Sequence, residues 1–162
     1  MAQIIIYTDG AAKGNPGPGG YGVVLLSGNH RKELSAGFRL TTNNRMELLA
    51  VIVALESIKK PEHEVIVYSD SKYVVDSIEK GWLQNWVKKG WKKPNGTVKN
   101  VDLWRRILPL LASHRPRFQW VKGHANIPEN ERCDQLAVKA SEKANLPMDQ
   151  GYEASLKEEG LF

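Results

Sequence analysis

The chain has 162 residues, one cysteine and a formal net charge of +5. This length suits one domain with a substantial core and is short for two domains with separate tasks. The single cysteine excludes an intramolecular disulfide and fits a reducing compartment, and no apolar run approaches the roughly 20 residues of a membrane-spanning helix. Because no basic and apolar leader is found either, we expect a cytoplasmic protein without a membrane partner, and its charge favours polyanionic partners.

The first predicted strand covers residues 4–7, an unbroken run of isoleucines closed by a tyrosine. Such a run is typical of a central strand that is buried on both faces. Asp9 follows where this strand should end, so rigid backbone would hold its carboxylate close to solvent, as a metal or proton-transfer site requires. Asp9-Gly10 is also a common turn sequence, and Asp9 alone does not decide between the two interpretations.

Two more strands are predicted at residues 21–26 and 31–39, with a short turn between them. With the first strand they predict an antiparallel meander. A helix should begin within residues 41–44, where Thr and Asn offer N-caps, and run to about Lys60, because Pro61 follows.

Glu47 is the only charged residue between Met46 and Leu55 in this apolar helix. It is either the acidic half of a capping box with Asn44 or a carboxylate with a function, and the pattern leaves both readings open.

A second apolar strand, at residues 65–68, leads to a second aspartate, Asp70. A helix at residues 71–80 follows, and the alternation of strand and helix from here on predicts a parallel half of the sheet. Two strands that each deliver an aspartate at the same kind of position are expected to be neighbours in one sheet.

Residues 80–101 carry six lysines, no acidic residue and three tryptophans, Trp82, Trp86 and Trp91. Lysine-rich segments are commonly just solvated surface. Exposed aromatic side chains among cations instead form a surface that binds a phosphate backbone and packs on sugars or bases. The tryptophans can also pack the short helices of this segment on one another.

The last part of the chain predicts a helix at residues 101–111, a short strand at residues 118–121 and a final helix from near Glu131. Cys133 belongs to the apolar stripe of that last helix, which makes it a small core residue and no nucleophile. Asp134 lies at the edge of the stripe. In the first helical turn it would complement the helix dipole, or it would take part in a site.

Four acids therefore share one description, since each adjoins an apolar segment that would bury its anchor: Asp9, Glu47, Asp70 and Asp134. If the two strands are neighbours and the helices pack across them, the four carboxylates converge. Converged carboxylates repel one another unless cations lie among them, and ligation by oxygen alone suits Mg²⁺ or Mn²⁺. Two such ions stabilise the attacking and leaving oxygens of a phosphoryl displacement, so an acidic pocket beside a basic surface indicates a nuclease.

The chain resembles the bacterial ribonuclease HI family in four motifs that extend over nearly its whole length: YTDGAAKGNPGPGGYG, TTNNRMEL, YSDSKYV and WVKGHANIPENERCDQLA. The resemblance implies an α/β, ribonuclease H-like fold whose five-stranded mixed sheet has three antiparallel strands, then two parallel ones, and helices on both faces. It implies one domain at residues 1–145, with a basic protrusion at 80–100. Residues 146–162 would form a tail, which we expect to be loosely attached.

The resemblance also implies endonucleolytic hydrolysis of the RNA strand of RNA–DNA hybrids, leaving 5′-phosphate and 3′-hydroxyl ends, by a monomer with two Mg²⁺ ions, or Mn²⁺. The implied catalytic residues are the four acids, as metal ligands, and His124, which would serve proton transfer or product release. The implied substrate contacts are Asn15, Asn43 and Asn44 in the minor groove, and Thr42, Asn100, Trp82, Lys88 and Lys89 along the DNA strand and in the basic protrusion.

The sequence departs from the family at Leu40, where a basic residue is expected near the phosphate pocket, with Arg39 beside it, and at Lys13 and Lys72. Two other functions stay open: a DNA endonuclease of a related fold, and a hybrid-binding module without catalysis. The asparagines and the spacing of the four acids argue against the first. The presence of all four acids and of His124 argues against the second.

Overall fold

The computed structural model describes residues 3–60, 63–123 and 126–158. Its centre is a five-stranded sheet with the strand order β3-β2-β1-β4-β7. The strands are β1 (Gln3–Ala12), β2 (Gly17–Ser27), β3 (His30–Thr41), β4 (Glu64–Ser69) and β7 (Arg117–Trp120). Strands β1, β2 and β3 are antiparallel, whereas β4 lies parallel to β1 and β7 parallel to β4. The predicted mixed sheet, with the isoleucine strand at its centre, is confirmed.

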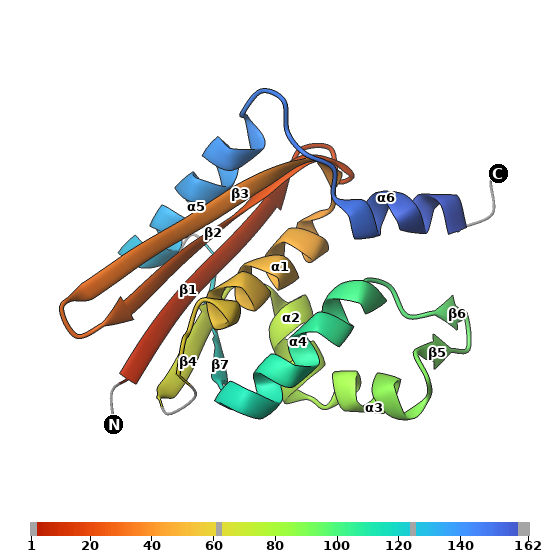
Figure 1. Ribbon diagram of the computed structural model, residues 1–162, viewed down its shortest axis with the longest axis horizontal. Coiled ribbons are helices and arrows are strands. Elements are labelled where there is room, and N and C mark those ends of the chain that lie inside the picture. Colours follow the sequence, from red (N-terminus) through yellow and green to blue (C-terminus); the bar gives the residue numbers. More distant parts are fainter. Residues whose placement is uncertain (1–2, 61–62, 124–125, 159–162) are drawn as a thin grey trace.

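Helices cover both faces of this sheet (Figure 1). The helices of the described residues are α1 (Asn43–Glu56), α2 (Lys72–Glu79), α3 (Trp82–Lys88), α4 (Val101–His114), α5 (Pro128–Ser141) and α6 (Gln150–Leu156). Helix α5 packs on one face, over β1, β2 and β3, and α1 packs on the other face with α4 and α2 beyond it. Among the described residues, every helix is too short or too polar to cross a membrane.

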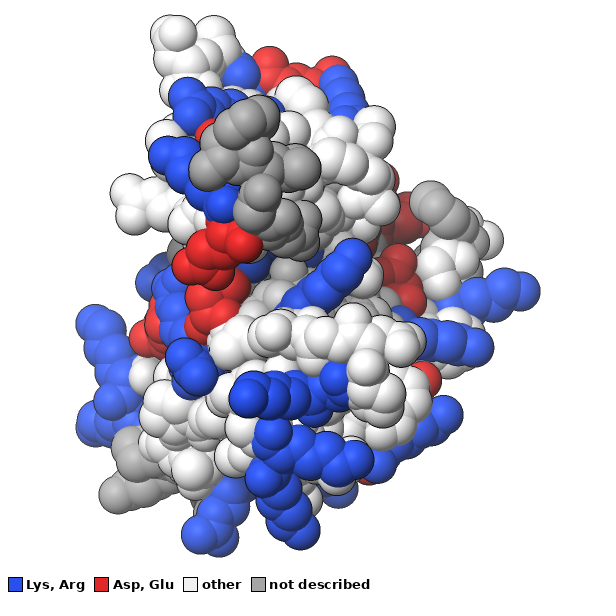
Figure 2. Space-filling view, turned by 90° about the vertical axis from the view of Figure 1, so that its right-hand side faces the viewer, with Lys and Arg blue, Asp and Glu red and all other residues white. Residues whose placement is uncertain are grey.

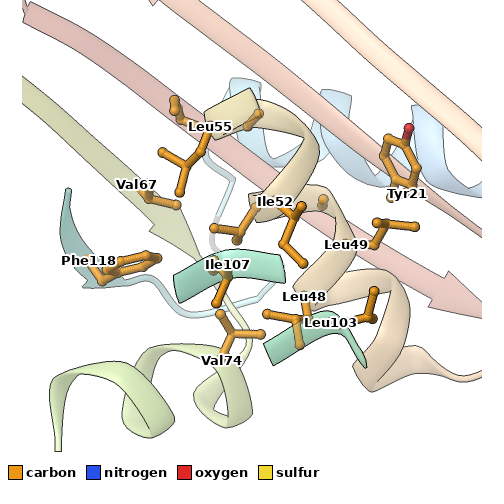
Figure 3. Packing of buried hydrophobic residues seen from close by; sticks show 14 of the residues in the cluster. Tyr21, Leu48, Leu49, Ile52, Leu55, Val67, Val74, Leu103, Ile107 and Phe118 are labelled. Carbon is orange, nitrogen blue, oxygen red and sulfur yellow. The ribbon is translucent and has the colours of Figure 1, made fainter. Parts of the chain in front are cut away.

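The core lies between the sheet and α4, with α1 in its middle (Figure 3). Helix α1 is apolar on all sides because the sheet buries one side of it and α4 and α2 bury the other. It ends at Glu56, earlier than the predicted Lys60, and the Ser57 hydroxyl donates to the Ala54 carbonyl there, 2.7 Å away.

The cap of α1 decides one open question about Glu47. Thr42 is the N-cap, and its hydroxyl oxygen accepts a hydrogen bond from the Arg45 backbone N–H at 3.2 Å. Glu47 therefore lies in the second turn and is not part of a capping box with Asn44, so that interpretation is wrong.

The basic protrusion consists of α3 and a small hairpin of β5 (Lys92–Lys93) and β6 (Gly96–Thr97). Trp91 is buried and the half-buried Trp86 packs on Trp104, with ring centroids 5.6 Å apart. Of the three tryptophans that the sequence offered for base stacking, only Trp82 is exposed, so the other two are part of the packing.

The end of the chain differs from expectation in its described part. Helix α6 follows the buried N-cap Asp149, which binds Arg45 on α1, and Glu153 on α6 binds Arg39 on β3. The prediction of a loosely attached tail is wrong for these residues, because charge pairs formed across the fold hold them in place.

Candidate active site

Asp9 and Asp70 meet at one edge of the sheet because their strands are parallel neighbours. Thr8 on β1 lies opposite Ser69 on β4, and the two aspartates are the next residues of the chain. Asp70 directly follows β4, but Asp9 lies within β1, because the pairing of β1 with β2 extends to Ala12, so the prediction that the first strand ends at Asp9 is wrong. Both aspartates line one cleft, as the sequence predicted.

Glu47 joins them from α1, and Gly10 permits the approach. The Gly10 backbone N–H donates to Asp9 Oδ1, 2.9 Å away, and also to Glu47 Oε1. A Cβ at Gly10 would overlap the Glu47 backbone nitrogen, so only glycine allows α1 to come this close. The carboxylates of Asp9, Glu47 and Asp70 each offer an oxygen within 4.8 Å of the others.

Asp134 lies on α5 in the wall of the same cleft, which has a volume of about 700 Å³, but outside the group of three. Helix α5 begins at Pro128, a favoured first helical residue, and not near Glu131. Asp134 is therefore in the second turn, which removes the helix-dipole interpretation. Cys133 beside it is buried and donates its thiol to the Tyr7 carbonyl at 3.2 Å, so it is the predicted core residue.

Burial controls the protonation of this cluster. It raises the pKa of Asp9 to about 7, with the charges of Asp70 and Asp134 adding to the effect. Burial and the charges of Asp9 and Asp70 hold the pKa of Glu47 well above its usual range. Glu47 Oε2 is buried and has no hydrogen-bond partner among the described residues. An unpaired carboxylate oxygen facing other carboxylates fits a cation ligand, because a buried charge without a partner is costly.

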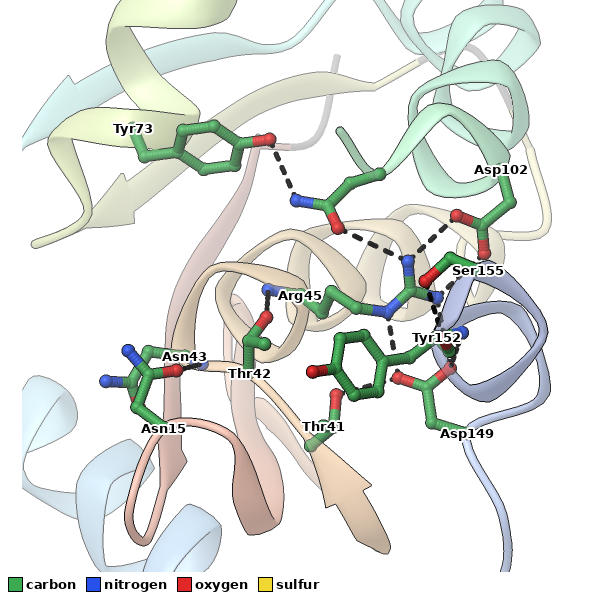
Figure 4. Close-up of polar contacts among 11 residues, drawn as sticks. Asn15, Thr41, Thr42, Asn43, Arg45, Tyr73, Asp102, Asp149, Tyr152 and Ser155 are labelled. Carbon is green, nitrogen blue, oxygen red and sulfur yellow. Dashed lines mark hydrogen bonds and ion pairs between the residues drawn. The ribbon is translucent and has the colours of Figure 1, made fainter. Parts of the chain in front are cut away.

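The asparagines form the adjacent wall. Asn43 Oδ1 accepts from the Ala12 N–H, and the Asn43 N–H donates to Asn15 Oδ1 at 2.9 Å (Figure 4). These bonds join the turn after β1 to the start of α1. Asn44 is exposed and lines the cleft together with Asn43.

Thr42 and Asn100 lie at the N-caps of α1 and α4, and Arg45 contacts both. Trp82 is 44% exposed on α3, with the Lys80 ammonium 5.8 Å from its ring centre. Lys88 and Lys89 are exposed at the end of α3. Figure 2 shows that Lys and Arg side chains gather on the surface that α3 and the β5–β6 hairpin form. His124 lies outside the described residues.

Two residues of this region were missed by the sequence reasoning. Asn130 is buried in the cleft, and its side-chain oxygen has no hydrogen-bond partner among the described residues. It precedes Asp134 by four residues and therefore lies on the same helix face. The four-residue spacing is visible in the sequence, but we expected the helix to begin near Glu131 and therefore placed Asn130 in the preceding loop. Lys72 is the only Lys or Arg among the described residues that line the cleft, and its ammonium lies 4.9 Å from the Trp120 ring centre.

Fold and cleft together define a class of protein with a ribonuclease H-like sheet and carboxylates on neighbouring parallel strands. The RNase H family model matches residues 1–142. Ribonuclease H of Desulforamulus reducens is 59% identical over 150 residues, covering 92% of this chain and 94% of the relative. Ribonuclease H of Syntrophus aciditrophicus is 59% identical over 152 residues, covering 93% and 87%. The chain belongs to the ribonuclease H family.

Solved structures agree with this assignment. LC9-RNase H1, described as a type 1 RNase H with the type 2 active-site motif, is 32% identical with a TM-score of 0.78, covering 87% of this chain and 72% of the other. LC11-RNase H1, solved in complex with an RNA/DNA hybrid, is 31% identical with a TM-score of 0.68, covering 88% and 99%.

Proposed function

We propose that the protein is an endoribonuclease that hydrolyses the RNA strand of RNA–DNA hybrids and leaves 5′-phosphate and 3′-hydroxyl ends. The single observation that carries the proposal is the convergence of Asp9, Glu47 and Asp70 within 4.8 Å, on a chain of the ribonuclease H family. The hybrid bound to the relative LC11-RNase H1 supports the choice of substrate.

The carboxylates are proposed to hold two Mg²⁺ ions, with Mn²⁺ as an alternative, and Asp134 completes the ligand set from the wall of the cleft. Bound divalent cations supply charge stabilisation to the attacking and leaving oxygens of phosphoryl transfer. In this chain Gly10 fixes the orientation of Asp9 and Glu47 through its N–H, and the unpaired Glu47 Oε2 is the ligand atom in need of a partner. His124 is proposed to move a proton or to assist product release.

Substrate recognition is proposed to divide between the two strands. Asn15, Asn43 and Asn44 offer amide groups to 2′-hydroxyls and base edges in the minor groove. The contacts to the DNA strand and its phosphates are assigned to Thr42, Asn100, Trp82, Lys88 and Lys89. A monomeric, cytoplasmic protein stays a prediction.

The test is cleavage of one labelled sequence presented as RNA–DNA hybrid, duplex RNA, duplex DNA and single-stranded RNA, with Mg²⁺ and with EDTA. Cleavage confined to the RNA of the hybrid and stopped by EDTA is expected. Cleavage of duplex DNA would instead favour the DNA endonuclease.

Asp70→Asn separates catalysis from binding. The variant should lose cleavage yet bind the hybrid as well as the wild type or better, because one negative charge leaves the cleft. Cleavage by Asp70→Asn at the wild-type rate would refute the metal site. A wild-type protein that binds the hybrid without cleaving it would instead favour the hybrid-binding module without catalysis.

A further inference from the structure

Helix α6 lies beyond residue 142, where the family match ends, and it reaches back to the N-termini of α1 and α4. Figure 4 shows Asp149, Tyr152 and Ser155 of this segment beside Arg45. The proposed ligands of the DNA-strand phosphate, Thr42 and Asn100, are the N-caps of those two helices. The end of the chain therefore contacts the support of the proposed phosphate site.

Arg45 is buried, and its guanidinium has no N–H left for a substrate. Nε donates to Asp149 at 2.9 Å, and Nη2 donates to Asp149 at 3.0 Å and Asp102 at 2.7 Å. Nη1 donates to Asp102 at 2.8 Å and to the Asn100 side-chain oxygen at 3.4 Å. These bonds use all five guanidinium N–H groups that an arginine has. Arg45 is thus a positioning residue and not a phosphate ligand.

The Arg45 guanidinium determines which atoms Asn100 presents, and the backbone of the same residue contacts Thr42. Because an arginine only donates, the Asn100 carbonyl oxygen must face it, which leaves the Asn100 amino group for the Tyr73 hydroxyl at 3.1 Å and for a further acceptor. The Arg45 backbone N–H donates to the Thr42 hydroxyl oxygen, so the Thr42 hydroxyl hydrogen is free to donate. Both caps therefore offer donors, the polarity that a phosphate oxygen needs.

Asp149 fixes Arg45 in this position. Its two oxygens accept from the guanidinium, from the Thr41 hydroxyl at 2.7 Å and from the Tyr152 N–H at 3.2 Å, where Asp149 caps α6. A Cβ at Gly151 would overlap the Asp102 carboxylate and approach Arg45 Nη2 to 2.8 Å. Helix α6 thus packs tightly at Gly151 against the charged side chains of Arg45 and Asp102.

We propose that Asp149 and helix α6 position the Arg45 guanidinium, and through it set Asn100 as a donor, beside Thr42, for a phosphate of the DNA strand. This rests on the proposed function, since it assigns a support to that same substrate site. It gives the segment after the family match a role in hybrid affinity and none in the chemical step.

The experiment measures hybrid binding in an Asp70→Asn background and KM and kcat in the active enzyme, for Asp149→Ala, Asn100→Ala and the double variant. Losing one oriented hydrogen bond should raise Kd and KM about three- to tenfold and leave kcat unchanged. In the double variant, Asp149→Ala should add little to Asn100→Ala, because both act through the same contact. Gly151→Ala should raise KM likewise while keeping every carboxylate, so it replaces Asp149→Ala if that variant does not fold.

Ile107→Val, a core change away from the cleft, is the matched control for general destabilisation. Any of three results would overturn the inference. The first is an equal rise of KM in Ile107→Val and Asp149→Ala, and the second is strict additivity in the double variant. The third is an unchanged KM in both Asp149→Ala and Gly151→Ala. A wild type that does not cleave hybrids would refute the proposed function instead, so the two failures are distinguishable.

Discussion

The backbone N–H of Gly10 donates to a side-chain oxygen of Glu47, although the two residues belong to different layers of the fold. Glycine is required at this position, since a Cβ there would overlap the Glu47 nitrogen and Met46. The contact brings the helix carboxylate to the two strand carboxylates.

Gly10→Ala should therefore push α1 away from β1, lower the free energy of unfolding by about 1–3 kcal/mol as in other overpacked sites, and abolish cleavage. Thermal unfolding and the hybrid cleavage assay check both effects. Gly28→Ala is the control, because Gly28 has a φ of +58° with nothing within 4 Å. That variant should lose some stability and keep its activity, and a Gly10→Ala enzyme with normal cleavage would contradict the assigned geometry.

The raised pKa of Asp9 predicts how stability depends on pH without metal. The folded state holds its proton up to a pKa of about 7, whereas the unfolded chain releases it near 3.8. The contribution of Asp9 to stability is thus fully present below the lower value and is lost as pH rises through the higher one. The proposed Mg²⁺ would bind the ionised carboxylate, so its stabilising effect should grow over the same window.

Melting temperatures between pH 4 and pH 8, with and without Mg²⁺, test this, using Asp9→Asn as the reference. The pKa values of Glu33 and Asp102 are lowered, so these groups change stability at more acidic pH. The difference between wild type and Asp9→Asn should contain the contribution of Asp9 together with the effect of its charge on Glu47. A metal effect that is the same at pH 5 and pH 8, or equally large in Asp9→Asn, would contradict the prediction.

The lysines of the protrusion should govern the salt dependence of hybrid binding. Replacing Lys88, Lys89, Lys92 and Lys93 with alanine is expected to weaken binding and to reduce the slope of log K against log salt by about one unit for each of these lysines that neutralises a phosphate. Lys32→Ala with Lys59→Ala, away from the protrusion, is the control. An unchanged slope in the fourfold variant would exclude a role for the protrusion in binding.

Trp82 and Trp91 should behave oppositely, although they share one segment. Trp91→Ala removes a buried side chain and should cost about 3–5 kcal/mol of stability. Trp82→Ala removes an exposed ring and should barely change stability but weaken hybrid binding. Denaturant unfolding and titration with the hybrid separate the two, and a large stability loss in Trp82→Ala would contradict its assignment as a substrate contact.

The sequence predicted most of the sheet because its signals are local. The apolar run before Asp9 and the one before Asp70 each identify a buried strand, and parallel pairing then brings the two aspartates together. An apolar helix with a single charge identified Glu47 as a candidate, although that pattern left the capping box open. These inferences need no knowledge of distant partners.

Other features depended on contacts between distant parts of the chain. The burial of Trp91 and Trp86 requires α4 beneath the protrusion, and nothing within residues 80–101 distinguishes these rings from Trp82. Asp149 looks like any surface acid until Arg45, more than 100 residues earlier, is placed beside it. Local patterns carry no information about such pairs.

Cys133, the one thiol of the chain, gives the assembled cleft a chemical reporter. Its thiol donates a hydrogen bond to the carbonyl of Tyr7 on β1, two residues before Asp9. Cys133 itself immediately precedes Asp134 on α5. Burial raises the pKa of this thiol, so it stays protonated and unreactive while α5 is seated on the sheet. The rate at which a thiol reagent labels the protein therefore reports how often α5 separates from β1, that is, how often Asp134 moves away from Asp9.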